Sequence, residues 1–164
     1  MAKTLILVRH GKSSWDNNLD DHDRPLKSRA FNDIELVTEK LKSHITRDFT
    51  FLSSTANRAK TTAEYFLKQL EIDKNEIQQD HELYTFDVNV LKQYIYNLNN
   101  DIDKIVIFGH NPAFTSLSNK LGSLLFGNVP TSGVVKIEFD NSNWKDCKQG
   151  ETKLYLFPKD LRND

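Results

Sequence analysis

The chain has 164 residues, and its 22 Lys and Arg side chains against 23 Asp and Glu give a formal net charge of −1. This length corresponds to one domain with a single hydrophobic core, and the near-neutral charge excludes a general field that would gather nucleic acid or an anionic membrane. Apolar runs of at most four residues exclude a transmembrane helix and a secretion signal. Cys147 has no second cysteine to pair with, so we expect a reduced, cytoplasmic protein.

The first third of the chain predicts a strand, a loop and a helix. Leu5–Val8 is a short, wholly apolar run, typical of a strand that is buried on both faces. Residues 12–26 are rich in Asp and Asn and predict a loop. Apolar residues then recur at every third or fourth position over about 28–44, which predicts an amphipathic helix with Ser28 as its N-cap.

The rest of the chain alternates between the same two patterns. The further elements expected are a strand over 49–52, a helix over about 59–70, a short strand before Glu82, a helix over 88–98, a strand over 105–108, a helix over 113–121, strands over 134–139 and 154–157, and a loose, charged tail from Pro158. Alternating strands and helices favour a single three-layer α/β/α domain with a mostly parallel central sheet. We expect this domain to span residues 1–164, with an ordered core over about 3–158.

Two histidines follow the two most apolar predicted strands. His10 comes after Leu5–Val8 and Arg9, and His110 comes after Ile105–Phe108 and a glycine. Ligands of open α/β sheets bind outside the carboxyl ends of the strands. We therefore expect the two imidazoles to face one another at that edge of the sheet.

Three of the six arginines are expected at the same edge. Arg9 precedes His10, Arg24 lies in the loop after the first strand, and Arg58 begins the helix after the second strand. Guanidinium groups match the geometry of phosphate, and neutral imidazole is a good nucleophile near pH 7 that needs no metal. The pattern favours phosphoryl transfer to a histidine, with arginines neutralising the phosphoryl oxygens.

Two other interpretations remain open at this point. His10, His22, His110, Asp21 and Asp23 are nitrogen and oxygen ligands of the kind that a metallohydrolase uses, although neighbouring arginines would repel a cation. The second interpretation is that the chain is a phosphate-binding module of the same fold that does not catalyse a reaction. Sensitivity to chelators tests the first alternative, and turnover of an aryl phosphate tests the second.

Several spaced segments resemble one known family. LILVRHGKSSW (residues 5–15) resembles the opening of the histidine phosphatase superfamily, whose fold is that of phosphoglycerate mutase. Blocks at 21–30, 53–66, 108–121 and 130–139 resemble the SixA-type phosphohistidine phosphatases in the same order. The resemblance implies a phosphatase without metal or cofactor that forms a phosphohistidine intermediate.

The resemblance also suggests the class of substrate. The short stretch between Arg58 and the strand before His110 leaves no room for a lid domain. An open site suits a phosphohistidine protein as the phosphorylated substrate, with a small phosphorylated metabolite as the alternative. Neither nucleic acid nor a membrane is expected as a partner.

The resemblance implies catalytic or phosphate-binding roles for four residues. His10 resembles the nucleophile, and Arg9 and Arg58 resemble the phosphate clamps. His110 resembles the second histidine, which is expected to act in its protonated form on a phosphoryl oxygen.

Three further residues are expected around this core. Arg24 and Asp21 resemble the pair that lines the entrance in SixA-type members and are expected to bind substrate. Glu82 loosely matches the proton-donating Glu of phosphomonoesterase members, but its position is equally typical of a surface acid.

Two positions depart from the SixA-type pattern. Its members often carry Ala where this chain has Gly11, and often carry Gly after the Arg-Pro-Leu block, where this chain has Ala30. Neither position belongs to the expected phosphate pocket.

Overall fold

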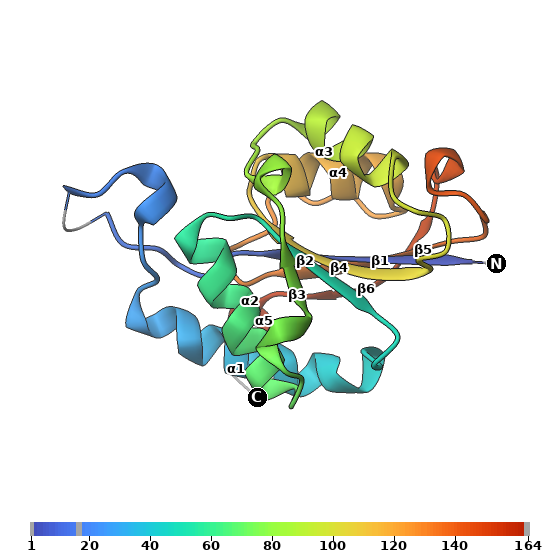
Figure 1. The fold of residues 1–164 in the computed structure, drawn as a ribbon. Coiled ribbons are helices and arrows are strands. Elements are labelled where there is room, and N and C mark those ends of the chain that lie inside the picture. The colour runs from blue at the N-terminus through green and yellow to red at the C-terminus, as the bar shows by residue number, and fades with distance from the viewer. Residues whose placement is uncertain (1, 16–17, 163–164) are drawn as a thin grey trace.

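The computed structural model describes residues 2–15 and 18–162, which are built around a six-stranded sheet in the order β3-β2-β4-β1-β5-β6 (Figure 1). The four strands β1 to β4 are parallel, whereas β5 is antiparallel to both of its neighbours. The predicted, mostly parallel sheet is therefore confirmed. Its strands are β1 (Lys3–Arg9), β2 (Thr50–Ser53), β3 (Ile77–Gln79), β4 (Lys104–Gly109), β5 (Val134–Phe139) and β6 (Glu151–Leu156).

Helices cover both faces of the sheet, which confirms the predicted three layers (Figure 1). One face carries α3 and α4, and the other carries α1, α2 and α5. The helices are α1 (Ser28–Leu41), α2 (Asn57–Gln69), α3 (Val88–Tyr96), α4 (Ala113–Leu121) and α5 (Pro158–Leu161). No helix in the described part of the chain is long and apolar enough to span a membrane.

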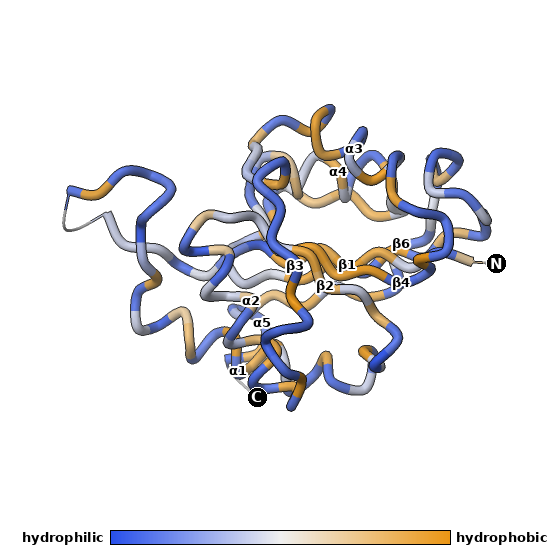
Figure 2. The backbone as a smooth tube through the Cα atoms, viewed as in Figure 1, coloured by the Kyte–Doolittle hydropathy of each residue, from blue (hydrophilic) through white to orange (hydrophobic). Residues whose placement is uncertain are grey.

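The central strands are apolar on both sides because each side faces a layer of helices. Leu5 and Leu7 of β1 pack into the cluster under α3 and α4, whereas Ile6 and Val8 pack into the cluster under α1 and α2. Figure 2 shows these central strands as hydrophobic segments between more polar loops. The continuous apolar run of β1 is the sequence signature of such a doubly covered strand.

Two sequence expectations are wrong in detail. Ser28 is the first residue of α1, and Lys27 takes the N-cap position without a side-chain hydrogen bond. The tail is not loose over its described part, because Pro158 begins α5 and the guanidinium of Arg162 lies 2.7 Å from the carboxylate of Asp33. The last two residues of the predicted tail lie outside the described residues.

Candidate active site

The register between β1 and β4 brings the two predicted histidines together. Arg9 of β1 lies opposite Gly109 of β4, and each is followed by a histidine. The backbone N–H of His10 donates to the carbonyl of Gly109 at 3.0 Å. The ring centroids of His10 and His110 are consequently 5.3 Å apart.

The hydrogen bonds of His10 fix the position of its ring proton. Nδ1 lies 2.7 Å from the carbonyl oxygen of Gly11. Because a carbonyl only accepts, Nδ1 carries the proton, and Nε2 of the neutral ring keeps its lone pair. That lone pair accepts from Nε of Arg58 at 3.4 Å.

The surroundings of His10 keep its imidazole neutral. Burial is the largest cause and lowers the pKa of His10 to about 3, the hydrogen bond to Gly11 opposes this shift, and the charge of Arg58 adds to it. At neutral pH the ring therefore presents an unprotonated Nε2, the form that a nucleophile requires.

His110 is also neutral in the site without phosphate, whereas the sequence analysis expects its protonated form to act on a phosphoryl oxygen. Burial, followed by the effects of His10 and Arg58, lowers the pKa of His110 to about 2. Nε2 lies 2.9 Å from Oγ of Ser54. Nδ1 is buried and has no hydrogen-bond partner among the described residues.

Arg58 is oriented by the loop that precedes α1. It lies in the first turn of α2, and its side chain is buried. Nη1 donates to the backbone carbonyl of Asp21 at 2.6 Å, and Nη2 donates to the carboxylate of Asp21 at 2.9 Å. These two bonds leave Nε directed at His10.

The Asp21 carboxylate is a junction between three donors. It accepts from Arg58, from Nη1 of Arg24 at 3.1 Å, and from the hydroxyl of Tyr84. Burial alone would raise the pKa of Asp21, but the hydrogen bonds from Tyr84 and Arg58 outweigh it and bring the pKa down to about 2. Sequence reasoning missed Tyr84, whose spacing from the motif residues carries no signal of this contact.

The other two predicted arginines are held by backbone carbonyls. Nη1 of Arg9 donates to the carbonyl of Val129 at 3.0 Å, while its buried Nε has no partner among the described residues. Nε of Arg24 donates to the carbonyl of Ser14 at 3.1 Å, and its guanidinium carbon lies 3.2 Å from the ring centroid of Trp15.

Asn111 fixes the loop that positions Arg9, a role that the sequence analysis did not assign. Its Nδ2 donates to the carbonyl of Val129 at 3.0 Å, the same oxygen that accepts from Arg9. Its Oδ1 accepts from the backbone N–H and the hydroxyl of Thr115, both at 3.1 Å. The position of Asn111 directly after His110 is the signal that could have identified it.

The two departures from the SixA-type pattern touch one another. Gly11 follows His10, and a Cβ atom at this position would lie 2.8 Å from Cβ of Ala30 in α1. Because real Cβ atoms do not approach so closely, only one of these positions can carry a methyl group without a shift of the backbone. Glycine at 11 and alanine at 30 are therefore a matched pair.

Next to these groups lies a cavity of about 280 Å³, called here the His10 cavity, and His110 is not among the residues that line it. Five of the predicted site residues line it, namely Arg9, His10, Asp21, Arg24 and Arg58. Residues that the sequence analysis did not select complete the lining: Lys12, Ser13, Trp15, Phe86, Asn111 and Thr131.

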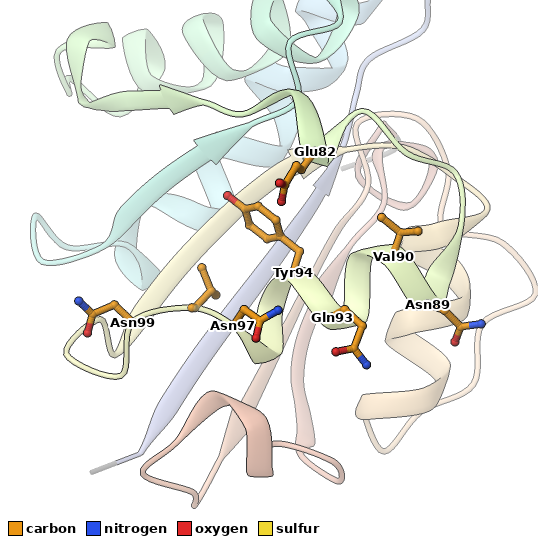
Figure 3. A pocket seen from close by; sticks show the side chains of 8 residues that line it. Glu82, Asn89, Val90, Gln93, Tyr94, Asn97 and Asn99 are labelled. Carbon is orange, nitrogen blue, oxygen red and sulfur yellow. The ribbon is translucent and has the colours of Figure 1, made fainter.

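Glu82 does not join this group. It lines a different hollow of about 730 Å³ along α3, together with Asn89, Gln93 and Tyr94. Figure 3 shows its carboxylate next to the Tyr94 ring in that hollow. Glu82 is thus not among the residues that line the His10 cavity, which favours the surface acid over the proton donor of the two roles considered for it.

The five residues proposed above as metal ligands do not converge. Over residues 2–15 and 18–162, no group of three or more His, Cys, Asp or Glu side chains is arranged to hold a metal ion. Nε2 of His22 instead lies 2.9 Å from the hydroxyl of Thr55.

Comparison with known families identifies the arrangement. A model described as the histidine phosphatase superfamily (branch 1) matches residues 5–95, which include His10, Arg24 and Arg58. The chain belongs to the histidine phosphatase superfamily. It is accordingly a hydrolase of the phosphatase class, and the resemblance seen in the sequence motifs is confirmed.

Solved structures of several phosphatases share this fold. A protein histidine phosphatase SixA complexed with tungstate matches with a TM-score of 0.80 and 22% identity, over 97% of this chain and 99% of that one. A mycobacterial glucosyl-3-phosphoglycerate phosphatase matches with a TM-score of 0.67 and 12% identity, over 94% and 98%. An uncharacterized protein of Mycobacterium tuberculosis is 26% identical, over 92% of this chain and 98% of its own length.

Proposed function

We propose that this histidine phosphatase dephosphorylates phosphohistidine in proteins, without a metal ion, through a phosphohistidine formed on His10. The observation that carries the proposal is the Nε2 lone pair of His10, which faces a cavity lined by Arg9, Arg24 and Arg58. A neutral nucleophile surrounded by guanidinium groups suits a tetrahedral dianion.

The proposed first step is an in-line displacement at phosphorus. Nε2 of His10 forms the new bond to phosphorus while the bond to the leaving nitrogen breaks, and the leaving imidazole retains the electron pair and takes a proton from water. Arg9 and Arg58 neutralise the phosphoryl oxygens. Nδ1 of His110, which has no described partner, donates to one of these oxygens. Water then attacks phosphorus, the bond from Nε2 of His10 to phosphorus breaks with its electron pair returning to Nε2, and inorganic phosphate leaves with the oxygen of the water while the excess proton passes to solvent.

The protonation states around the cavity support an easy leaving group. Asp21 is the one carboxylate that lines the cavity among the described residues, and its low pKa keeps it ionised at neutral pH. No protonated carboxyl is therefore ready to protonate an alkoxide, whereas imidazole leaves with less assistance. This favours phosphohistidine over an alkyl phosphate.

The structural similarity to a glucosyl-3-phosphoglycerate phosphatase supports a second candidate for the substrate, namely a small phosphorylated metabolite. The test compares kcat/KM for a phosphohistidine protein, an aryl phosphate and a sugar phosphate. We expect the sugar phosphate to be the poorest substrate, and a preference for it of more than about 100-fold, or ~2.7 kcal/mol, would overturn the proposal.

The covalent intermediate and the lack of a metal requirement have their own tests. His10→Ala should lower kcat by several orders of magnitude, and acid-labile phosphate should appear on His10 of the quenched wild-type enzyme. Retention of activity within about tenfold in this variant would exclude His10 as the nucleophile.

Excess chelator should leave the rate unchanged, whereas a loss restored by zinc or magnesium would favour a metallohydrolase.

We also propose that the protein acts in the cytoplasm. Its single cysteine, Cys147, is buried as a free thiol, which is compatible with a reducing compartment. Cell fractionation with an antibody to the protein tests this location.

A further inference from the structure

Two exposed aromatic side chains line the otherwise polar His10 cavity. Trp15, from the loop after β1, is 75% exposed, and Phe86, from the segment before α3, is 46% exposed. Large aromatic side chains contribute most to binding free energy when a ligand removes their faces from water. Two such rings at one charged cavity therefore present apolar surface that a ligand can cover.

Both rings are positioned by groups that belong to the site. The Trp15 ring stacks on the guanidinium of Arg24, whose carbon lies 3.2 Å from the ring centroid. The Phe86 ring packs edge-on against the His110 imidazole at a centroid distance of 5.3 Å and against Tyr84 at 5.7 Å. Each ring thus contacts a side chain of the candidate site.

The direction of the reaction relates the rings to the leaving group. His10 is only 7% exposed, whereas both aromatic rings face solvent. An in-line displacement puts the leaving atom on the far side of phosphorus from Nε2. A nucleophile at the buried base of the cavity therefore directs the leaving group toward the solvent side, where the exposed rings lie.

We infer that Trp15 and Phe86 form a stacking subsite for a planar, aromatic leaving group, such as the imidazole of phosphohistidine or an aryl ring. The inference rests on the proposed function for the nucleophile and adds a means of recognising the leaving group. Aromatic rings attract one another at centroid separations of about 4.5–7 Å in offset or edge-on arrangements. A ringless leaving group would gain none of this attraction.

The test measures kcat/KM for Trp15→Ala and Phe86→Ala with two classes of substrate. Ring-bearing substrates are a phosphohistidine peptide and phenyl phosphate, and ringless substrates with good leaving groups are acetyl phosphate and phosphoramidate. We expect losses of about 3- to 10-fold for the first class and less than about twofold for the second. Trp15→Phe and Phe86→Tyr, which keep a ring, should restore most of the preference.

Inhibition by stable analogues separates binding from chemistry. Phenylphosphonate should inhibit the wild-type enzyme more strongly than methylphosphonate, and this ratio of inhibition constants should fall in both alanine variants. Val90→Ala is the matched control, because Val90 is 48% exposed and lines the hollow along α3 instead. We expect it to leave both ratios unchanged.

Two outcomes would overturn the subsite. Equal losses on both classes would mean that Trp15 acts only through Arg24, and the absence of any loss would mean that neither ring contacts the leaving group. Failure of the proposed function would look different, because phenyl phosphate would still report the subsite in an enzyme that does not act on phosphohistidine.

Discussion

The carboxylate of Asp21 lies 2.9 Å from Nη2 of Arg58, while Nε of the same guanidinium lies 3.4 Å from the nucleophilic nitrogen of His10. Asp21 therefore holds the arginine that faces the reacting atoms. Its negative charge also lies close to where a phosphate dianion would bind. Asp21 thus favours catalysis by positioning Arg58 and opposes phosphate binding by charge repulsion. A substitution that removes its charge separates these two effects.

Asp21→Asn should lower kcat and leave the affinity for anions at least as strong. We expect kcat with an aryl phosphate to fall about tenfold or more, because a misplaced guanidinium stabilises the transition state less well. The inhibition constant of inorganic phosphate should not rise, since one negative charge is removed. Asp23→Asn is the control, because the carboxylate of Asp23 lies 3.5 Å from Nδ1 of His22 and Asp23 does not line the His10 cavity. Parallel losses of kcat and phosphate affinity would contradict this division of roles.

The buried histidines predict a loss of stability on acidification. The pKa of His10 is about 3 in the folded chain against 6.5 ordinarily, so the unfolded chain binds more protons between these values. The free energy of unfolding should therefore fall as pH decreases from about 6.5 toward 3, and His10 contributes at most about 1.4 kcal/mol per pH unit.

Denaturant unfolding of wild type and His10→Asn at several pH values between 8 and 4 measures this contribution. Asparagine keeps a donor for the Gly11 carbonyl but does not titrate. The variant should show a shallower fall in stability with acidification. Identical slopes would show that His10 is not held neutral by its surroundings.

Glu82→Gln should leave kcat/KM within about twofold for aryl, alkyl and phosphohistidine substrates alike. The reason is geometric, because Glu82 lines the hollow along α3 and not the His10 cavity. A selective loss on alkyl phosphates would instead show that Glu82 reaches the leaving oxygen during turnover.

Gly11→Ala should destabilise the protein by about 1–3 kcal/mol, because its new methyl group would meet Ala30 at 2.8 Å. Ala30→Gly removes the opposing methyl group, at the cost of glycine in the first turn of α1. We expect the double variant to be more stable than the sum of the two single effects predicts, as measured by a double-mutant cycle of unfolding free energies. Simple additivity would mean that the two positions do not contact one another.

The sequence was sufficient to predict the sheet and the proximity of His10 to His110, because both depend on short apolar strands that end at the same edge of the sheet. It did not reveal the Asp21–Tyr84 contact or the separation of Glu82 from the cavity. Those depend on how loops fold over the edge, and loop paths leave no periodic pattern in the residues. Arg162 was missed for a related reason, since its partner Asp33 lies far away in the chain.

The pairing of Arg9 with Gly109 makes enzymatic activity a strict reporter of correct folding. Side chains of a strand alternate between its two faces, so a slip of one residue between β1 and β4 would place a histidine among the wrong neighbours. A chain with native-like helix content but a shifted register would thus be inactive. Recovery of turnover during refolding should consequently lag behind the return of secondary structure and coincide with the final alignment of these two strands.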